Sequence, residues 1–390
     1  MRLNLTLFFV VFWLLICVLY CILYGYNDMT IIIFIGSISF LLGSLPAYWI
    51  FSTLKKKIRL KEFTINFRTE NILISIYSIV FSISVFLAYL SLSWYRQGYD
   101  WGQIRGIFLA AEGIPGPLKL ILVGFVVPCV YITGIVFSIE FFFSKHNRKR
   151  NILLFLSASS VVLYGFASQG RFVFLYFLVC LYISYITFGK KFETSKKIKK
   201  FLISLVGVIL LMTVYRGIEN AGDSSLITAS MSIVNYMVLP IDMMNYYIPE
   251  FDKEKFIGEG LVFLGGFIDL LENFFNMVGV KVFTSLEQLD SILSTINDEP
   301  IDIRGGKANA FVSCFSYFYL DGRLLGVIIE SAIFGFLTGM LEIKKKQSLV
   351  FYTYYLFAWI LIAMSPARWG FTQMNIAMCP IYLWLFYKKY

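Results

Sequence analysis

The chain alternates between long apolar runs and short polar stretches. A helix needs roughly 20 apolar residues to cross about 30 Å of hydrocarbon, where its backbone groups must bond internally. Such runs occur at 5–24, 30–53, 71–93, 118–143, 152–168, 172–188, 202–215, 324–341, 348–365 and 373–387. The pattern predicts an all-α fold, a polytopic membrane helix bundle of about ten spans that forms a single integral membrane domain over residues 1–390.

Lysine and arginine gather in every second connection between these runs. The basic stretches lie at the N-terminus, at 55–68, 145–150, 190–200 and 344–346, and at the C-terminus, and they hold most of the 34 Lys and Arg residues. Basic loops stay on the cytoplasmic side of a membrane. The sequence therefore predicts a multi-pass protein of the cytoplasmic (inner) membrane with both termini in the cytoplasm.

Composition and charge agree with this class. The chain is 58% hydrophobic and only 15% charged, which excludes an ordinary soluble enzyme and a disordered chain. The net charge of +10 belongs mainly to the loops that orient the spans, so we expect membrane lipid as a partner and no nucleic acid.

The predicted external side holds the long segment 216–323 and a short turn at 168–171. A connection of this length is usually functional, and its apolar pieces predict interfacial helices that fold back over the bundle. An alternative with two further spans, at 226–247 and 257–278, keeps the same sidedness. The short turn fits either a tight hairpin or a re-entrant feature.

Arginines recur along this predicted external side. They are Arg171, Arg216, Arg304, Arg323 and Arg368. The planar, permanently charged guanidinium suits phosphate oxygens, so the set predicts substrate binding to a lipid-linked diphosphate. The alternative is that each arginine ends a span by extending to the interface. Arg171 is the strongest candidate because it lies between two closely spaced apolar runs.

If the lipid-linked diphosphate carries a sugar, the reaction would be a glycosyl transfer. Such a transfer needs a base that removes the proton from the attacking hydroxyl. Asp302 and Asp321, near Arg304 and Arg323 in sequence, are the catalytic candidates; Glu330 fits a proton relay or a polar contact inside the bundle. The single histidine, His146, falls in a predicted cytoplasmic loop, which argues against an external triad or histidine metal site. We expect no metal and no cofactor.

Two tracts give a resemblance to a known family. Residues Ser168–Phe172 (SQGRF), and Asn309–Ser313 followed by Tyr317–Gly326, resemble O-antigen and capsular polysaccharide polymerases of the Wzy type, also called oligosaccharide repeat unit polymerases. The resemblance implies a glycosyltransferase-type enzyme that joins undecaprenyl-diphosphate-linked oligosaccharide repeat units into surface polysaccharide on the external face, without metal. It carries the family's external arginines to Arg171, Arg304 and Arg323, and it suggests a chain-length regulator as a partner.

Two other classes compete with this interpretation. The related O-antigen ligases are associated with an external histidine, which this chain lacks. A lipid-linked oligosaccharide flippase, or another polytopic transporter, would have charged residues lining its interior and short loops on both faces. The nearly charge-free spans and the long segment 216–323 favour the polymerase.

Overall fold

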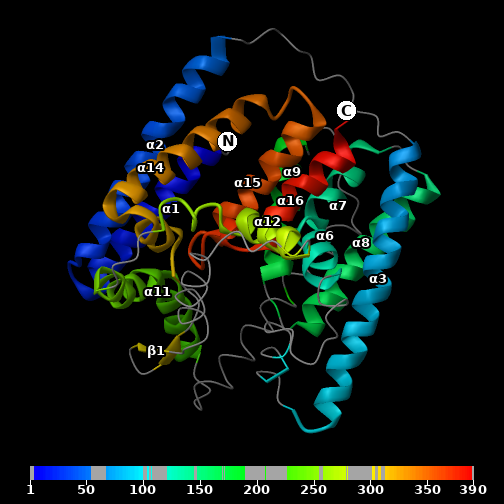
Figure 1. Cartoon of the computed structure of the whole chain (residues 1–390), viewed down its shortest axis with the longest axis horizontal. Helices are drawn as coiled ribbons and strands as arrows, with labels where there is room; N and C mark the ends of the chain where they lie inside the picture. The colour runs from blue at the N-terminus through cyan, green and yellow to red at the C-terminus, as the bar shows by residue number, and fades with distance from the viewer. Residues whose placement is uncertain are drawn as a thin grey trace.

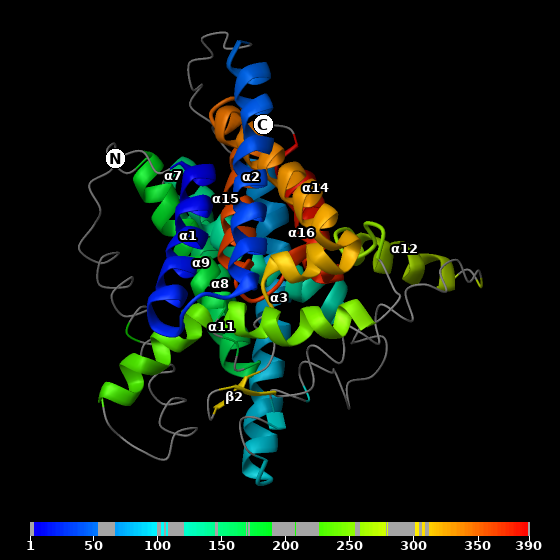
Figure 2. The same ribbon diagram turned by 90° about the vertical axis from the view of Figure 1, so that its left-hand side faces the viewer.

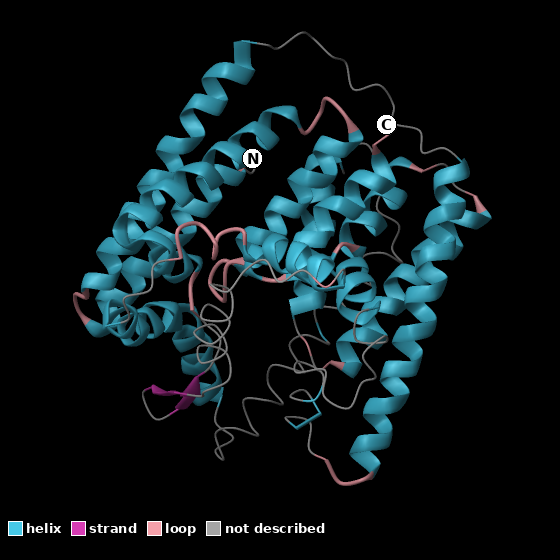
Figure 3. Ribbon diagram, in the orientation of Figure 1, coloured by secondary structure: helices cyan, strands magenta, loops and turns pink. Residues whose placement is uncertain are grey.

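The computed structural model describes residues 4–53, 67–99, 103–104, 107, 121–144, 147–168, 170, 172–188, 207, 226–253, 258–277, 279, 301–303, 306–308 and 312–388. Within these residues the protein is a bundle of helices, and its only strands are a short antiparallel pair, β1 (Ile301–Ile303) and β2 (Gly306–Ala308) (Figures 1 and 3). The all-α prediction is confirmed at this level.

Every predicted apolar run except 202–215 coincides with helix in the described residues. The helices are α1 (Leu5–Tyr24), α2 (Asp28–Thr53), α3 (Phe67–Arg96), η1 (Leu122–Val126), α6 (Val127–Tyr131), α7 (Thr133–Phe143), α8 (Arg148–Ala167), α9 (Phe172–Phe188), α14 (Cys314–Lys344), α15 (Leu349–Met364) and α16 (Met374–Tyr387). The run 202–215 lies outside the described residues, apart from Gly207.

Five of these helices, α1, α2, α3, α8 and α14, are long and apolar enough to cross a membrane. A sixth span results if the pair η1–α6 and α7, bent by 43°, counts as one crossing. Helices α9, α15 and α16 are apolar but shorter. The helices thus indicate a membrane protein, while the count of about ten spans stays a prediction.

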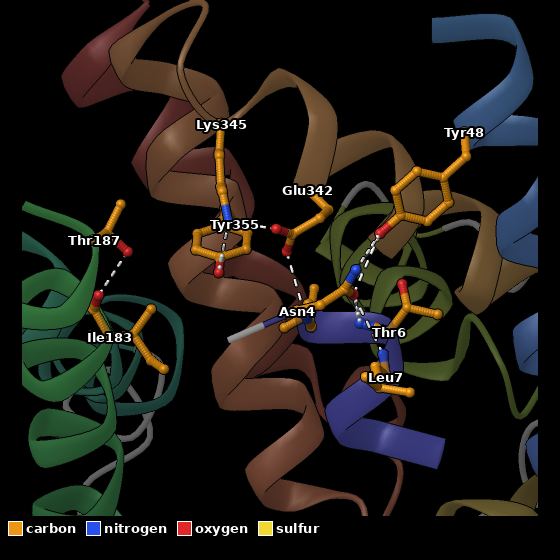
Figure 4. Close-up of polar contacts among 10 residues, drawn as sticks. Asn4, Thr6, Leu7, Tyr48, Ile183, Thr187, Glu342, Lys345 and Tyr355 are labelled. Atoms are coloured by element: carbon orange, nitrogen blue, oxygen red, sulfur yellow. Dashed lines mark hydrogen bonds and ion pairs between the residues drawn. The ribbon is translucent and has the colours of Figure 1, made fainter. Parts of the chain in front are cut away.

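The helices run up and down between two ends of the bundle. At one end the backbone N–H of Leu5 donates to Glu342 at 3.2 Å, and Glu342 also pairs with Lys345, whose ammonium reaches the Tyr355 hydroxyl at 3.0 Å (Figure 4). The starts of α1 and α15 therefore meet the end of α14 there. We call this the basic end because it carries the described residues Arg148, Lys149, Lys344 and Lys345.

The opposite end has its own connections between distant segments. The Ser91 hydroxyl of α3 donates to the Ala167 carbonyl of α8 at 2.9 Å, and the Cys314 N–H donates to the Ser365 carbonyl at 2.8 Å. The last turns of α3, α8 and α15 and the start of α14 therefore lie at this end. Helix α16 returns to the basic end, so α1 begins and α16 ends on the same side (Figures 1 and 2).

Small residues allow α2 and α14 to pack closely. A Cβ atom added at Gly43 would lie 2.1 Å from the Ala332 carbonyl oxygen, and one at Gly335 would lie 1.9 Å from that of Phe40. Backbones approach this closely only where no side chain intervenes, as in other membrane helix pairs. Against this pair, Phe9 of α1 and Phe315 of α14 form part of an aromatic core.

The predicted loop 216–323 contains two further helices. α11 (Leu226–Lys253) lies across the lower end of the bundle in Figure 2, and the Tyr20 hydroxyl at the end of α1 donates to its Asp242 at 3.0 Å. α12 (Gly265–Met277) packs its first residues against Thr372 and Gln373. Neither is among the helices suited to span a membrane.

The end of that predicted loop differs from the structure. Helix α14 already begins at Cys314 and contains a break at Gly322 and Arg323, where the backbone leaves helical geometry. The sequence places the start of the span at 324 because the polar residues Asp321 and Arg323 interrupt the apolar run. In the structure both lie inside one bent helix.

Candidate functional site

The turn between α15 and α16 is held by Trp369. Its indole is 1% exposed, stacks on Phe263 with ring centroids 5.0 Å apart, and donates from Nε1 to the Phe263 carbonyl at 2.8 Å. Phe318 and Phe334 of α14 complete the contact at 5.0 and 4.9 Å. Helix α15 has 16 residues, roughly 24 Å of helix, and the turn that follows it packs against α14 and Phe263.

Arg368, the residue before this tryptophan, is partly buried and faces three tyrosines from different helices. It interacts electrostatically with Tyr131 at the end of α6, Tyr176 of α9 and Tyr317 of α14. Tyr176 and Tyr317 are both 3% exposed, and the rings of Tyr131 and Tyr176 are 5.7 Å apart. We call these four residues the Arg368 site.

Among the described residues, the polar groups of this site have no hydrogen-bond partner. Throughout the described part of the chain, no residue accepts a hydrogen bond or ion pair from the Arg368 guanidinium, and none pairs with the hydroxyls of the three tyrosines. A guanidinium with neighbouring hydroxyls is a set of donors suited to an anionic or polyhydroxylated ligand.

Helix irregularities position Tyr131. The segment begins as a π-helix, η1, and breaks between α6 and α7, where the backbone of Ile132 (φ −86°, ψ 0°) leaves regular helix. Single π-turns occur frequently at functional sites. The break places Tyr131 level with Tyr176, because Gly134 packs directly on the backbone of Phe177.

Asp321 anchors the turn 258–264 to α14. Its Oδ1 accepts from the N–H groups of Gly260 and Val262 at 3.0 and 2.9 Å, and its Oδ2 accepts from Phe263 at 2.6 Å. The side chain is 2% exposed. Because Phe263 also stacks on Trp369, this carboxylate indirectly positions the turn that carries Arg368. A role as base stays a prediction.

Glu330 lies beside this carboxylate. It is 7% exposed, its Oε2 has no hydrogen-bond partner among the described residues, and it interacts electrostatically with Asp321. Its polar neighbour inside the bundle is thus Asp321, and a proton relay stays a prediction.

Arg323 is turned toward a different part of the protein. Its Nη2 donates to the Phe251 carbonyl at 2.5 Å, and its Nε lies 3.5 Å from Asp252, so it ties α14 to the end of α11. Its backbone has φ 56°, in the left-handed region that disfavours side chains other than glycine. The Arg323 side chain thus has protein partners, whereas Arg368 has none within the described ranges.

The remaining predicted residues cannot be placed as side chains. Arg171, Arg216 and Arg304 lie outside the described residues, and Asp302 is described only as part of β1, where it pairs in register with Lys307. Among the predicted site residues, the structure links Asp321 and Arg368 indirectly. Asp321 accepts from the Phe263 N–H, and Phe263 contacts Trp369, the residue after Arg368. The described residues contain no group of three His, Cys, Asp or Glu that could hold a metal.

Sequence reasoning missed the three tyrosines. They lie within or beside apolar runs, where a tyrosine ordinarily belongs to the interfacial belt. Only their shared electrostatic interaction with Arg368 distinguishes them. A scan against protein-family models, a search of curated proteins and a search of solved structures each found no match to the chain.

Proposed function

We propose that this protein is a polysaccharide polymerase that joins undecaprenyl-diphosphate-linked oligosaccharide repeat units on the external face of the cytoplasmic membrane. The observation that carries the proposal is the guanidinium of Arg368, which has no acceptor in the part of the chain that the structure describes. It interacts with Tyr131, Tyr176 and Tyr317, toward the end of the bundle opposite the basic end. A diphosphate would supply the acceptors that this arginine lacks.

The chemistry would combine charge stabilisation with proton removal. As the sugar–phosphate bond breaks, negative charge develops on the leaving diphosphate, and the guanidinium and phenol donors would stabilise it. Arg171 is the second predicted ligand, because its charge lies in sequence between two closely spaced apolar runs. Arg216, Arg304 and Arg323 are weaker candidates, and Asp302 and Asp321 remain the predicted bases.

The outer surface suits a lipid-linked substrate. On α14 the side chains of Leu325 and Ile329 are 63% and 48% exposed, and on α12 those of Leu271 and Phe274 are 50% and 62% exposed. Helix α12 alternates these residues with Asp269 and Glu272 in the pattern of an interfacial helix. We infer that it lies at the membrane surface, where the carrier diphosphate would also lie.

A flippase for lipid-linked oligosaccharides is the second candidate. The break between α6 and α7 and the bend in α14 at Gly322 favour it, because interrupted helices commonly form transporter binding sites. Both candidates bind the same anionic ligand, so they differ only in the step after binding.

Reconstituted protein with lipid-linked repeat units separates the two. A ladder of longer chains indicates the polymerase, and movement between leaflets without a ladder indicates the flippase. We expect Arg368→Ala to abolish ladders and Arg368→Lys to restore them only weakly, because lysine lacks the planar fork. Arg96→Ala, an exposed arginine at the end of α3, is the matched control. Full ladders from Arg368→Ala at normal protein levels would refute the site.

A further inference from the structure

A second unusual polar cluster lies at the basic end, between α3, α7 and α8. Glu140 of α7 is 0% exposed, and neither of its carboxylate oxygens has a hydrogen-bond donor. Glu70, in the first turn of α3, is 3% exposed and accepts from the Ser144 hydroxyl at 2.5 Å and from the Asn147 amide at 3.2 Å. Two carboxyl groups are therefore buried together, and one of them is unpaired.

The nearby arginine does not pair with Glu140. Arg150 of α8 donates from Nε to the Glu140 backbone carbonyl at 3.1 Å and from Nη2 to the Phe141 carbonyl at 2.9 Å. Its donors thus cap the last turn of α7. Its positive charge acts on both carboxyl groups, so Arg150 can balance one negative charge, not two.

The other helices that pack on α7 supply no compensating charge. α6, α9 and α15 contain no charged residue, and the charged groups that act on Glu140 in the described chain are Glu70 and Arg150. Lys145 and His146 lie outside the described residues. An unpaired buried carboxylate costs several kcal/mol, which a bound cation or proton removes.

We propose that Glu140 is a proton-binding site that exchanges with the basic end through Ser144 and Glu70. One proton from water adds to one carboxylate oxygen and gives the neutral acid; its return to water restores the carboxylate. The path is short. Ser144 lies one helical turn after Glu140, where its N–H donates to the Glu140 carbonyl at 3.2 Å, its hydroxyl donates to Glu70, and Glu70 also accepts from the exposed Asn147. A proton fits better than a metal ion, since the described residues offer no further carboxylate or histidine ligand here.

Occupancy of this site would control the packing of α7. With Glu140 neutral, the end of α7 stays docked between α3 and α8, capped by Arg150. Ionisation of Glu140 would draw water to its carboxylate or displace the end of α7. Helix α7 begins at the break after Tyr131, so such a movement would act on that break. The inference does not depend on the proposed function, because it concerns the opposite end of the bundle.

Infrared spectroscopy of the purified full-length chain tests this directly. A protonated carboxyl has a carbonyl stretch, distinct from that of a carboxylate, that shifts in heavy water. At neutral pH, we expect the wild-type spectrum to contain the band of one protonated carboxyl group that is absent from the Glu140→Gln spectrum. This band should disappear as the pH is raised to alkaline values. Glu250→Gln, which removes a carboxylate that is 54% exposed on α11, is the matched control and should retain the band. Ser144→Ala should retain it but slow its hydrogen–deuterium exchange.

Each other outcome overturns the proposal. If the spectra of wild type and Glu140→Gln have the same protonated-carboxyl bands, Glu140 is ionised in the wild-type protein. If sodium stabilises the wild-type protein more than choline does, and Glu140→Gln loses this difference, the site binds a metal cation. Glutamine has the shape and neutrality of the protonated acid, so failure of Glu140→Gln to fold would also contradict a neutral Glu140.

Discussion

Replacement of Trp369 tests how firmly the turn before α16 is held. The indole is 1% exposed and contacts four phenylalanine rings, those of Phe263, Phe318, Phe334 and Phe371. Truncation of such a side chain to alanine costs about 3–5 kcal/mol. Part of this is the hydrogen bond from Nε1 to the Phe263 carbonyl, which contributes about 1 kcal/mol.

We therefore expect Trp369→Ala to lower the free energy of unfolding by about 4 kcal/mol, and Trp369→Phe by about 1–2 kcal/mol, because phenylalanine keeps most ring contacts. Reversible denaturation in mixed micelles measures both. Trp49→Ala, whose indole is 75% exposed, is the control and should change stability by less than about 0.5 kcal/mol. The reasoning fails if Trp369→Ala is as stable as wild type, or if the two replacements of Trp369 are equally damaging.

Other contacts give three further predictions. Gly335→Val should separate α2 from α14 and lower the free energy of unfolding by at least about 3 kcal/mol in the same denaturation assay. In the control Gly124→Ala, the added carbon meets nothing within 4 Å, so the loss should be under about 1 kcal/mol. Equal effects of the two substitutions would contradict the close packing. Asp321→Asn places amide hydrogens against backbone donors and should cost about 3 kcal/mol, with faster hydrogen exchange at 258–264; unchanged exchange would count against the anchor. If the basic end is cytoplasmic, an impermeant thiol reagent should label Tyr26→Cys in intact cells and Lys346→Cys only after permeabilisation, in a background without native cysteines; the reverse pattern would invert the proposed sidedness.

Much of the fold could be predicted from local pattern. The apolar runs located the described helices to within a few residues, as at 5–24 and 172–188, because a helix in lipid needs a continuous apolar stretch. The pattern was less informative at 314–323, where helix α14 continues through Asp321 and Arg323. Those two polar residues are tolerated because the turn 258–264 and α11 satisfy them, and neither partner is adjacent in sequence.

Only part of the candidate site could be predicted from the local sequence pattern. Arginine at the end of a predicted span identified Arg323 and Arg368 equally, with no local signal to separate them. The structure distinguishes them by their partners: Arg323 bonds Phe251 and lies beside Asp252, while Arg368 faces three tyrosines. Such differences arise from the packing of helices that lie far apart along the chain.

The sequence by itself determined the class of protein, the positions of most helices and the alternation of basic connections, because these depend on hydrophobicity and charge along the chain. Only the tertiary structure decided that the turn with Arg368 packs against α14 and Phe263, and that Tyr131, Tyr176 and Tyr317 interact with this arginine. It also decided that Glu140 and Glu70 are buried together. These are properties of how separate helices pack, and packing brings together residues that no local pattern relates.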